Sequence, residues 1–128
     1  MRTNSIAKKN RAIQTKLEKV ISYTKQTMVA YMSEEDLNRL CTYVAEYSSG
    51  DTLQKITPVK VDSQLKSIDI MHFGWNIGKA FGIKRIHTAT FIKNVFAYTL
   101  RDLEISTIER KMSHTESECY IKLQQLKE

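Results

Sequence analysis

Three of the four glycines in this chain lie in one stretch, Ile68-Asp-Ile-Met-His-Phe-Gly-Trp-Asn-Ile-Gly-Lys-Ala-Phe-Gly82. The four-residue step places Gly74, Gly78 and Gly82 on one face of a helix. An interior glycine costs a helix about 0.5–1 kcal/mol relative to alanine, so Gly74 and Gly78 indicate close approach of another backbone. Gly82 is expected to end the helix in the left-handed conformation. The stretch therefore predicts a helix over residues 68–81 that packs tightly on a neighbour.

The composition is that of an ordinary globular protein. The chain has 128 residues, of which 41% are hydrophobic and 27% charged, and this length is sufficient to bury a core. No apolar run approaches the roughly 18 residues of a membrane span, and no apolar signal core follows the first charged residues. Cys41 and Cys119 are too few for a disulfide scaffold. We therefore expect a cytoplasmic protein without a membrane partner.

Upstream of the glycine stretch, the pattern predicts a helical hairpin within residues 1–50. Apolar residues recur at three- and four-residue steps over residues 5–32, which indicates one long amphipathic helix. Ser33 followed by three acidic residues is a good start for a second helix, and Ser48-Ser-Gly-Asp51 is a clear stop. Because almost nothing joins the two helices, they should be antiparallel. Packing on the rest of the domain is favoured over a free-standing coiled coil.

Residues 51–66 are expected to be a connector between the hairpin and a compact unit over residues 67–128. Pro58 disfavours helix at Thr57, and either a short edge strand or an irregular segment fits the pattern. Within the compact unit, a helix is expected from about residue 88 to 100. Its apolar residues cover most of its circumference, so it should be the most buried helix.

Two capping-box patterns predict further helices near the C-terminus. Ser106–Glu109 is expected to open a short fifth helix, and Thr115–Glu118 a last helix carrying Tyr120, Leu123 and Leu126. The expected fold is therefore all-α, a single domain over residues 1–128 with five or six helices. The N-terminal hairpin should pack on the compact C-terminal unit.

The helices on either side of Gly82 resemble a helix-turn-helix pair. Phe81-Gly82-Ile83 supplies a large apolar residue, a glycine that tolerates positive φ and an apolar plug. Gly78 stands where such turns usually carry alanine. Thr88 stands where they usually carry a branched apolar residue, which is a mismatch. The alternative is a plain helical hairpin whose polar strip is solvated.

The charge distribution favours a polyanionic partner. The net charge is +6; residues 1–32 hold seven Lys and Arg against one Glu, and residues 67–100 hold four against one Asp. Lys and Arg suit phosphates or guanine edges, Asn suits adenine, and Thr reaches phosphate or a thymine methyl. The side chains expected to contact double-stranded DNA are Lys84, Arg85, His87, Thr88, Thr90, Lys93 and Asn94 near the second helix of the pair, and Lys8, Arg11, Lys16 and Lys19 on the first helix of the chain. The alternative for the first helix is an ordinary solvated basic face.

A different class of function is a helical protein–protein interaction module, including a homodimer. The face that carries Gly74 and Gly78 would then be either a packing face inside the domain or a seam between two copies. Trp75 beside it would be an interface anchor or a core residue. The apolar stripe of the first helix is a second candidate surface for this class.

Nothing in the sequence indicates catalysis, a cofactor or a metal. His72, His87 and His114 form no His-x-x-x-His pattern, and the cysteines form no Cys-x-x-Cys pattern. No phosphate-cradling glycine loop is present. We therefore expect a non-catalytic DNA-binding or regulatory accessory protein without a bound cofactor.

Part of the chain resembles a group of bacterial proteins. The segments Asp69-Ile-Met-His-Phe-Gly-Trp-Asn-Ile-Gly78, Phe91-Ile-Lys-Asn-Val-Phe96 and Ser106-Thr-Ile-Glu-Arg-Lys-Met112 resemble small uncharacterised proteins of Bacteroidetes, some of them carried on mobile elements. The basic turn and Thr90-Phe91 are also similar to regulatory proteins of conjugative transposons. The resemblance covers about a third of the chain. It implies no established activity and favours the DNA-binding hypothesis.

Overall fold

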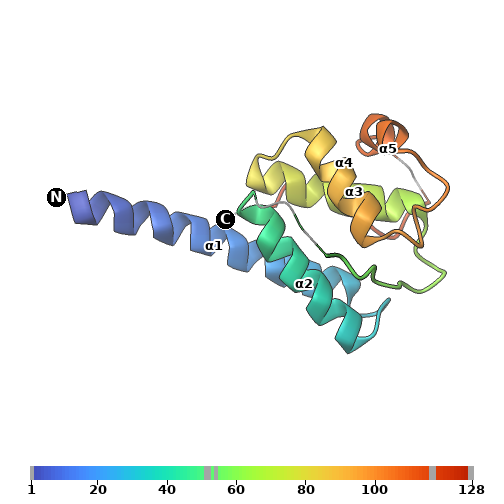
Figure 1. Cartoon of the computed structure of the whole chain (residues 1–128), viewed down its shortest axis with the longest axis horizontal. Coiled ribbons are helices and arrows are strands. Elements are labelled where there is room, and N and C mark those ends of the chain that lie inside the picture. Colours follow the sequence, from blue (N-terminus) through green and yellow to red (C-terminus); the bar gives the residue numbers. More distant parts are fainter. Residues whose placement is uncertain (1, 51–52, 54, 116–117, 127–128) are drawn as a thin grey trace.

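The computed structural model describes residues 2–50, 53, 55–115 and 118–126, with side chains from residue 14 onward. Within these ranges the secondary structure is entirely helical, as predicted for an all-α fold, and no strand occurs. The five helices are α1 (Arg2–Met28), α2 (Glu34–Ser48), α3 (Ser67–Phe81), α4 (Arg85–Val95) and α5 (Ile105–Lys111) (Figure 1). No helix in the described ranges is long and apolar enough to cross a bilayer.

The predicted helices of the N-terminal hairpin are present. α2 runs back along the second half of α1, while the first half of α1 projects away from the body (Figure 1). The Ser33 hydroxyl accepts a hydrogen bond from the Asp36 amide at 3.1 Å, which caps α2 as its sequence indicates. α1 ends at Met28 rather than near residue 32, because the chain must turn before that cap.

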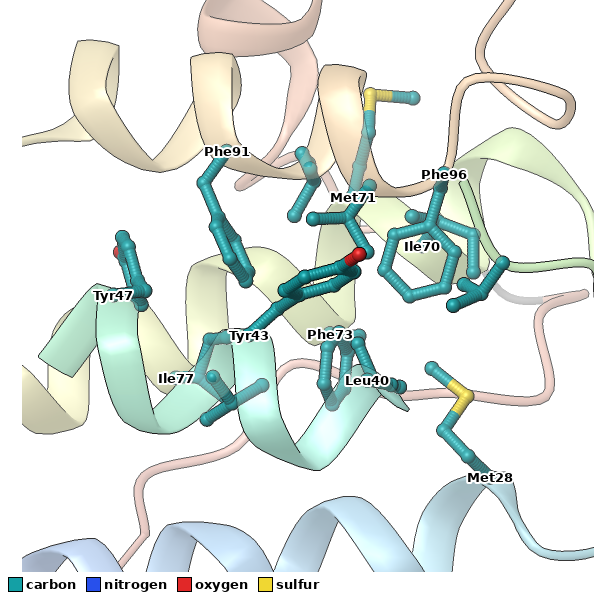
Figure 2. Packing of buried hydrophobic residues seen from close by; sticks show 14 of the residues in the cluster. Met28, Leu40, Tyr43, Tyr47, Ile70, Met71, Phe73, Ile77, Phe91 and Phe96 are labelled. Atoms are coloured by element: carbon teal, nitrogen blue, oxygen red, sulfur yellow. The ribbon is translucent and has the colours of Figure 1, made fainter. Parts of the chain in front are cut away.

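Helix α3, and not α4, is the most buried helix. Nine of its fifteen residues are buried, against five of eleven in α4, because α3 lies between α1 on one side and α4 and α5 on the other. Phe73 is fully buried and stacks on Tyr23 of α1, with ring centroids 5.9 Å apart. Figure 2 shows Phe73 together with Leu40 of α2, Met28 of α1 and Phe96, which follows α4.

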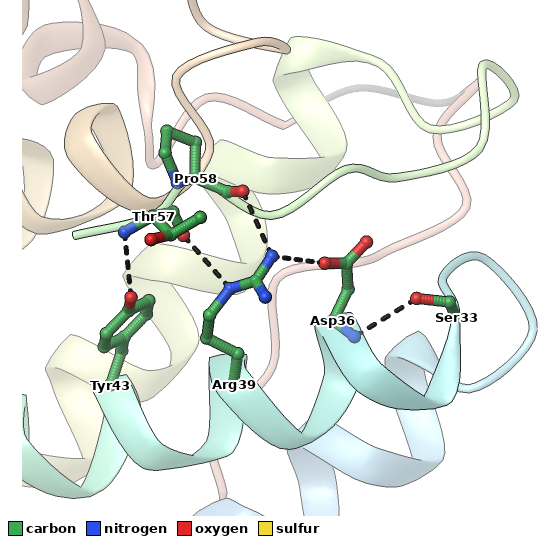
Figure 3. Close-up of polar contacts among 6 residues, drawn as sticks. All are labelled: Ser33, Asp36, Arg39, Tyr43, Thr57 and Pro58. Carbon is green, nitrogen blue, oxygen red and sulfur yellow. Dashed lines mark hydrogen bonds and ion pairs between the residues drawn. The ribbon is translucent and has the colours of Figure 1, made fainter.

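The connector between the two halves has no regular structure over its described residues, 53 and 55–66. It is held to α2 by side chains rather than by strand pairing (Figure 3). Arg39 donates to the carbonyls of Thr57 at 3.2 Å and Pro58 at 3.4 Å, and the Tyr43 hydroxyl accepts from the Thr57 amide at 2.9 Å. These contacts favour the irregular segment over the edge strand.

Three expectations for the second half are wrong in detail. α4 spans residues 85–95 rather than 88–100, since Lys84 is its N-cap and the chain turns after Val95. Glu104 occupies the N-cap position of α5 without a side-chain capping bond, so Ser106 lies inside the first turn rather than at the cap. No helix follows Thr115 in the described residues, and residues 118–126 run extended along α3. Glu116 and Ser117, which belong to the second predicted capping box, lie outside the described residues.

The extended segment 118–126 is held by buried polar side chains of α3. Asp69 accepts hydrogen bonds from the amides of Tyr120 at 2.6 Å and Ile121 at 3.0 Å. Asn76 donates to the carbonyl of Lys122 and accepts from the amide of Gln124, both at 2.8 Å. Because Asp69 and Asn76 are 1% and 0% exposed, these bonds satisfy groups that water cannot reach. We call residues 118–126 the C-terminal segment.

Candidate nucleic-acid interface

The turn between α3 and α4 contains the left-handed glycine that the sequence predicts at this place. Gly82 has φ of 70° and lies in the left-handed region, where a side chain would be strained. The amide of Ile83 closes the end of α3 on the carbonyl of Gly78 at 2.9 Å. Lys84 then occupies the N-cap position of α4, whose first residue is Arg85. The basic residues of the turn therefore lie at the start of the second helix.

Gly74 and Gly78 lie against α4 within the same chain. A Cβ atom added at Gly78 would lie 2.5 Å from Thr88 Oγ1, and one added at Gly74 would lie 2.9 Å from Ile92 Cδ1. Both glycines are buried, so this face is not available as a seam between two copies. Trp75, beside it, is half-buried, and the Lys79 ammonium lies 5.8 Å from its ring centroid.

Thr88 lies inside the α3–α4 contact and is only 1% exposed. Its hydroxyl is 2.5 Å from the Tyr47 hydroxyl and donates to the carbonyl of Lys84 at 3.2 Å. Valine has nearly the same shape but lacks the hydroxyl that bonds to Tyr47 and to the Lys84 carbonyl, which explains why threonine stands here in place of a branched apolar residue. This position corrects the expectation that Thr88 contacts nucleic acid, because DNA cannot reach a buried side chain.

Two of the predicted phosphate ligands are engaged with carbonyls of this chain. The Arg85 guanidinium donates to the Glu109 carbonyl near the C-terminal end of α5 and to Ser113 Oγ at 3.0 Å. Lys93 Nζ donates to the carbonyls of Leu100 at 2.8 Å and Arg101 at 3.0 Å. Both cations satisfy carbonyls at helix or turn ends, which the sequence spacing did not reveal. Arg85 is nevertheless exposed, whereas Lys93 is half-buried.

The remaining polar residues predicted on α4 surround a different hollow. His87, Thr90 and Asn94 line a pocket of about 320 Å³ whose other walls include Tyr47 and Phe91. The Thr90 hydroxyl donates to the Ile86 carbonyl at 2.8 Å, and His87 and Asn94 are exposed. Burial raises the pKa of Tyr47 to about 12, with the hydrogen bond to Thr88 acting against this, so Tyr47 is a neutral phenol at physiological pH.

The basic residues that the structure brings together extend from α1 to the α3–α4 turn. Lys16, Lys19 and Lys79 line a hollow of about 230 Å³ between α1 and the end of α3. Lys79 also lines an adjoining hollow of about 370 Å³ with Lys84 and Arg85. We call these five residues the cationic band. Lys8 and Arg11 belong to the projecting half of α1, and their side chains lie outside the described part of the chain.

Lys79 is a residue that the sequence prediction missed as a DNA ligand. It sits on the last turn of α3, and only the tertiary packing of α1 beside this turn joins it to Lys16 and Lys19. The signal in the sequence that could have identified Lys79 was its position five residues before the basic pair Lys84-Arg85.

Among the described residues, no group of three His, Cys, Asp or Glu side chains could hold a metal ion. Burial raises the pKa of the Cys41 thiol, with Lys25 acting against the shift, so this cysteine is a weak nucleophile at neutral pH. His72 is fully enclosed and contacts backbone carbonyls.

No family model, no curated protein and no solved structure matches the chain. The function is therefore inferred from the geometry of the cationic band alone.

Proposed function

We propose that this protein is a non-catalytic accessory protein that binds double-stranded DNA through the cationic band. The observation that carries the proposal is the position of Lys79, which lines both hollows and so makes the α1 lysines continuous with the α3–α4 turn. A continuous row of cations on two elements suits a regularly spaced polyanion better than a small ligand. Trp75, which lies under Lys79, adds an apolar contact within the same surface.

The proposed contact is mainly with phosphates rather than with base edges. Thr88 is buried and Lys93 is bonded to carbonyls, so α4 offers few of the side chains that a recognition helix uses to read bases. Lys16, Lys19, Lys79 and Lys84 have the point charges that suit phosphate oxygens. Binding should therefore depend strongly on salt and weakly on sequence.

The interaction-module alternative has less support. The glycine face packs on α4, and Val20, Thr24 and Met28 of the α1 stripe are fully buried within the chain. Among the residues whose side chains are described, the exposed large apolar ones are Val29, Ile86, Tyr98 and Tyr120, on four separate parts of the sequence. The glycine face and the part of the α1 stripe at Val20, Thr24 and Met28 are therefore not open to a partner.

Salt-dependent binding to a labelled mixed-sequence duplex, followed by fluorescence anisotropy, tests the proposal. Each neutralised phosphate contributes about −0.9 to the slope of log K against log salt, so the five cations of the band predict a slope of at most about −4.5. Affinity should then fall by about 10²–10³-fold between roughly 50 and 200 mM salt.

A pair of double variants locates the contact. Lys79→Ala with Lys84→Ala should reduce the slope by about two, because both ammonium groups belong to the band. Lys55→Ala with Lys60→Ala removes the same charge from the exposed connector and should leave the slope nearly unchanged. Arg85 is kept in both because it also holds α5. Absence of binding at low salt, or equal slopes for the two variants, would overturn the proposal.

A further inference from the structure

A pocket between the end of α2, the connector and α4 has no part in the proposed DNA contact. Its volume is about 320 Å³, and none of the five residues of the cationic band is among its described walls. Small-molecule sites in proteins have volumes of roughly 300–1,000 Å³, so this pocket is at the small end of that range. Its walls combine an apolar interior with one polar edge, which is the usual composition of such a site.

The interior of the pocket is apolar. Tyr47 and Phe91 are buried and stack with their ring centroids 4.2 Å apart (Figure 2). Leu53, Ile56 and Ile83 are half-buried and line the same space. Water forms few hydrogen bonds with walls of this kind, so an apolar group that displaces it from them is favoured.

The polar edge of the pocket is one face of α4. His87, Thr90 and Asn94 line it at steps of three and four residues, so they lie in one row along the helix. The Thr90 hydroxyl donates to the Ile86 carbonyl at 2.8 Å, so toward a ligand it acts as an acceptor. The side chains of His87 and Asn94 have no hydrogen-bond partner within the described part of the chain. Both are therefore free to bond to a ligand.

The Asn94 amide determines which ligand group suits this edge. The amide carries a donor and an acceptor side by side, so its complement is a group with an acceptor and a donor side by side. A cyclic amide, or lactam, has this arrangement, with its N–H next to its C=O. None of the described lining residues is Lys, Arg, Asp or Glu, so no such side chain offsets the hydration that a charged ligand would lose. The pocket therefore favours a neutral ligand.

The volume of the pocket sets the size of the ligand. An apolar cavity of about 150 Å³ holds one benzene ring, and this pocket is about twice as large. We propose that the pocket is a binding site for a neutral, planar ligand of two fused rings that carries a lactam edge. The rings fill the apolar interior, and the lactam bonds to Asn94. This site does not depend on the proposed DNA binding.

Nuclear magnetic resonance of the full ¹⁵N-labelled chain, titrated with 2-quinolinone, tests the proposal. This probe is a neutral two-ring lactam of about eleven non-hydrogen atoms, for which we expect a dissociation constant on the order of 1 mM. The amides of Leu53, Phe91 and Asn94 should shift together and saturate, while the amide of Lys79 on the cationic band should not move. No saturating shift at several times that concentration, or shifts centred on the cationic band, would overturn the proposal.

Two related probes test the chemistry of the edge. N-methyl-2-quinolinone keeps the rings and the carbonyl but lacks the N–H donor, and quinoline-2-carboxylate replaces the lactam by a negative charge. Each should bind about tenfold more weakly than 2-quinolinone, because a hydrogen bond to Asn94 is lost or a charge is dehydrated without a partner. Equal affinity for all three probes would refute a lactam-binding site.

A pair of variants assigns the contact to Asn94. Asn94→Ala should weaken the binding of 2-quinolinone about tenfold and remove the preference over its N-methyl derivative. Asn94 is exposed, so this change should leave the core intact, and the remaining amide signals report whether it does. Asn38→Ala removes the same side chain from an exposed position of α2 outside the pocket and should leave the affinity unchanged. Equal affinities for the two variants would show that Asn94 does not hold the ligand and would overturn the proposal.

Discussion

Replacing Gly78 by alanine tests whether the α3–α4 contact requires a glycine. The added Cβ would lie 2.5 Å from Thr88 Oγ1, 3.1 Å from Thr88 Cγ2 and 3.2 Å from the Tyr47 hydroxyl oxygen. Thr88 cannot easily move aside, because its β-branched side chain is stiff and its hydroxyl is bonded to Tyr47 and to the Lys84 carbonyl. Either the helices must separate slightly or the Tyr47–Thr88 hydrogen bond must break.

The change in the free energy of unfolding is the sum of one stabilising and two destabilising contributions. Alanine stabilises the interior of a helix by about 1 kcal/mol relative to glycine. Overpacking at this contact costs about 1–3 kcal/mol, and loss of the Tyr47–Thr88 hydrogen bond costs about 1 kcal/mol more. Gly78→Ala should therefore destabilise the protein by about 1–3 kcal/mol, which for a chain of this length lowers the melting temperature by about 3–5 °C per kcal/mol.

Urea unfolding followed by circular dichroism measures this free energy, and a double-mutant cycle assigns its cause. Thr88→Ala removes both of the nearest clashing atoms, so Gly78→Ala should cost far less in that background than in the unaltered chain. A glycine without a packing role would instead give a Gly78→Ala protein about 1 kcal/mol more stable than the original. That result, or strict additivity with Thr88→Ala, would refute the close-approach explanation.

Two further predictions concern residues that hold the second half of the chain together. Arg85→Ala should lower the free energy of unfolding by about 1–3 kcal/mol, because the carbonyl of Glu109 and the hydroxyl of Ser113 lose their shared donor; a urea midpoint equal to that of the original protein would contradict this. Tyr47 binds its proton more tightly when folded, because its pKa is about 12 and that of an exposed tyrosine is about 10. Its contribution to stability is therefore complete below pH 10 and falls by up to about 3 kcal/mol as pH rises through 12. Tyr47→Phe should remove this part of the alkaline destabilisation, and parallel stability curves for the two proteins between pH 10 and 12 would show the reasoning to be wrong.

The elements that the sequence predicted well are those specified by neighbouring residues. The start of α2 depends on the Ser33 hydroxyl and the Asp36 amide, three residues apart, and the end of α3 depends on the conformation of Gly82. Such signals act within one turn, so they are visible in a short window of sequence.

The C-terminal segment shows why other elements could not be predicted in the same way. Its apolar spacing fits a helix, but its backbone groups bond to Asp69 and Asn76, which lie 46 to 52 residues away in the sequence. Buried polar partners on α3 outweigh a local preference, and no window around Thr115 contains them.

The sequence predicted which kinds of residue line the candidate interface better than it predicted which individual residues do so. Lys84 and Arg85 were found because they adjoin the glycine turn. Arg85 nevertheless bonds to a carbonyl 24 residues away, and Lys93 to carbonyls 7 and 8 residues away. Whether a cation faces solvent or the chain's own carbonyls depends on how α5 and the turn after α4 are packed. Sequence spacing carries no information about that packing.

The row of polar residues on α3 also has a consequence during synthesis of the chain on the ribosome. Asp69 and Asn76 are translated about fifty residues before their partners in the segment 120–124. Until those residues emerge, α3 must either keep these groups in water or leave them unsatisfied against a half-formed core. Completion of the fold is therefore delayed until the segment has left the exit tunnel, and a nascent chain stalled before residue 120 should be an attractive target for chaperones.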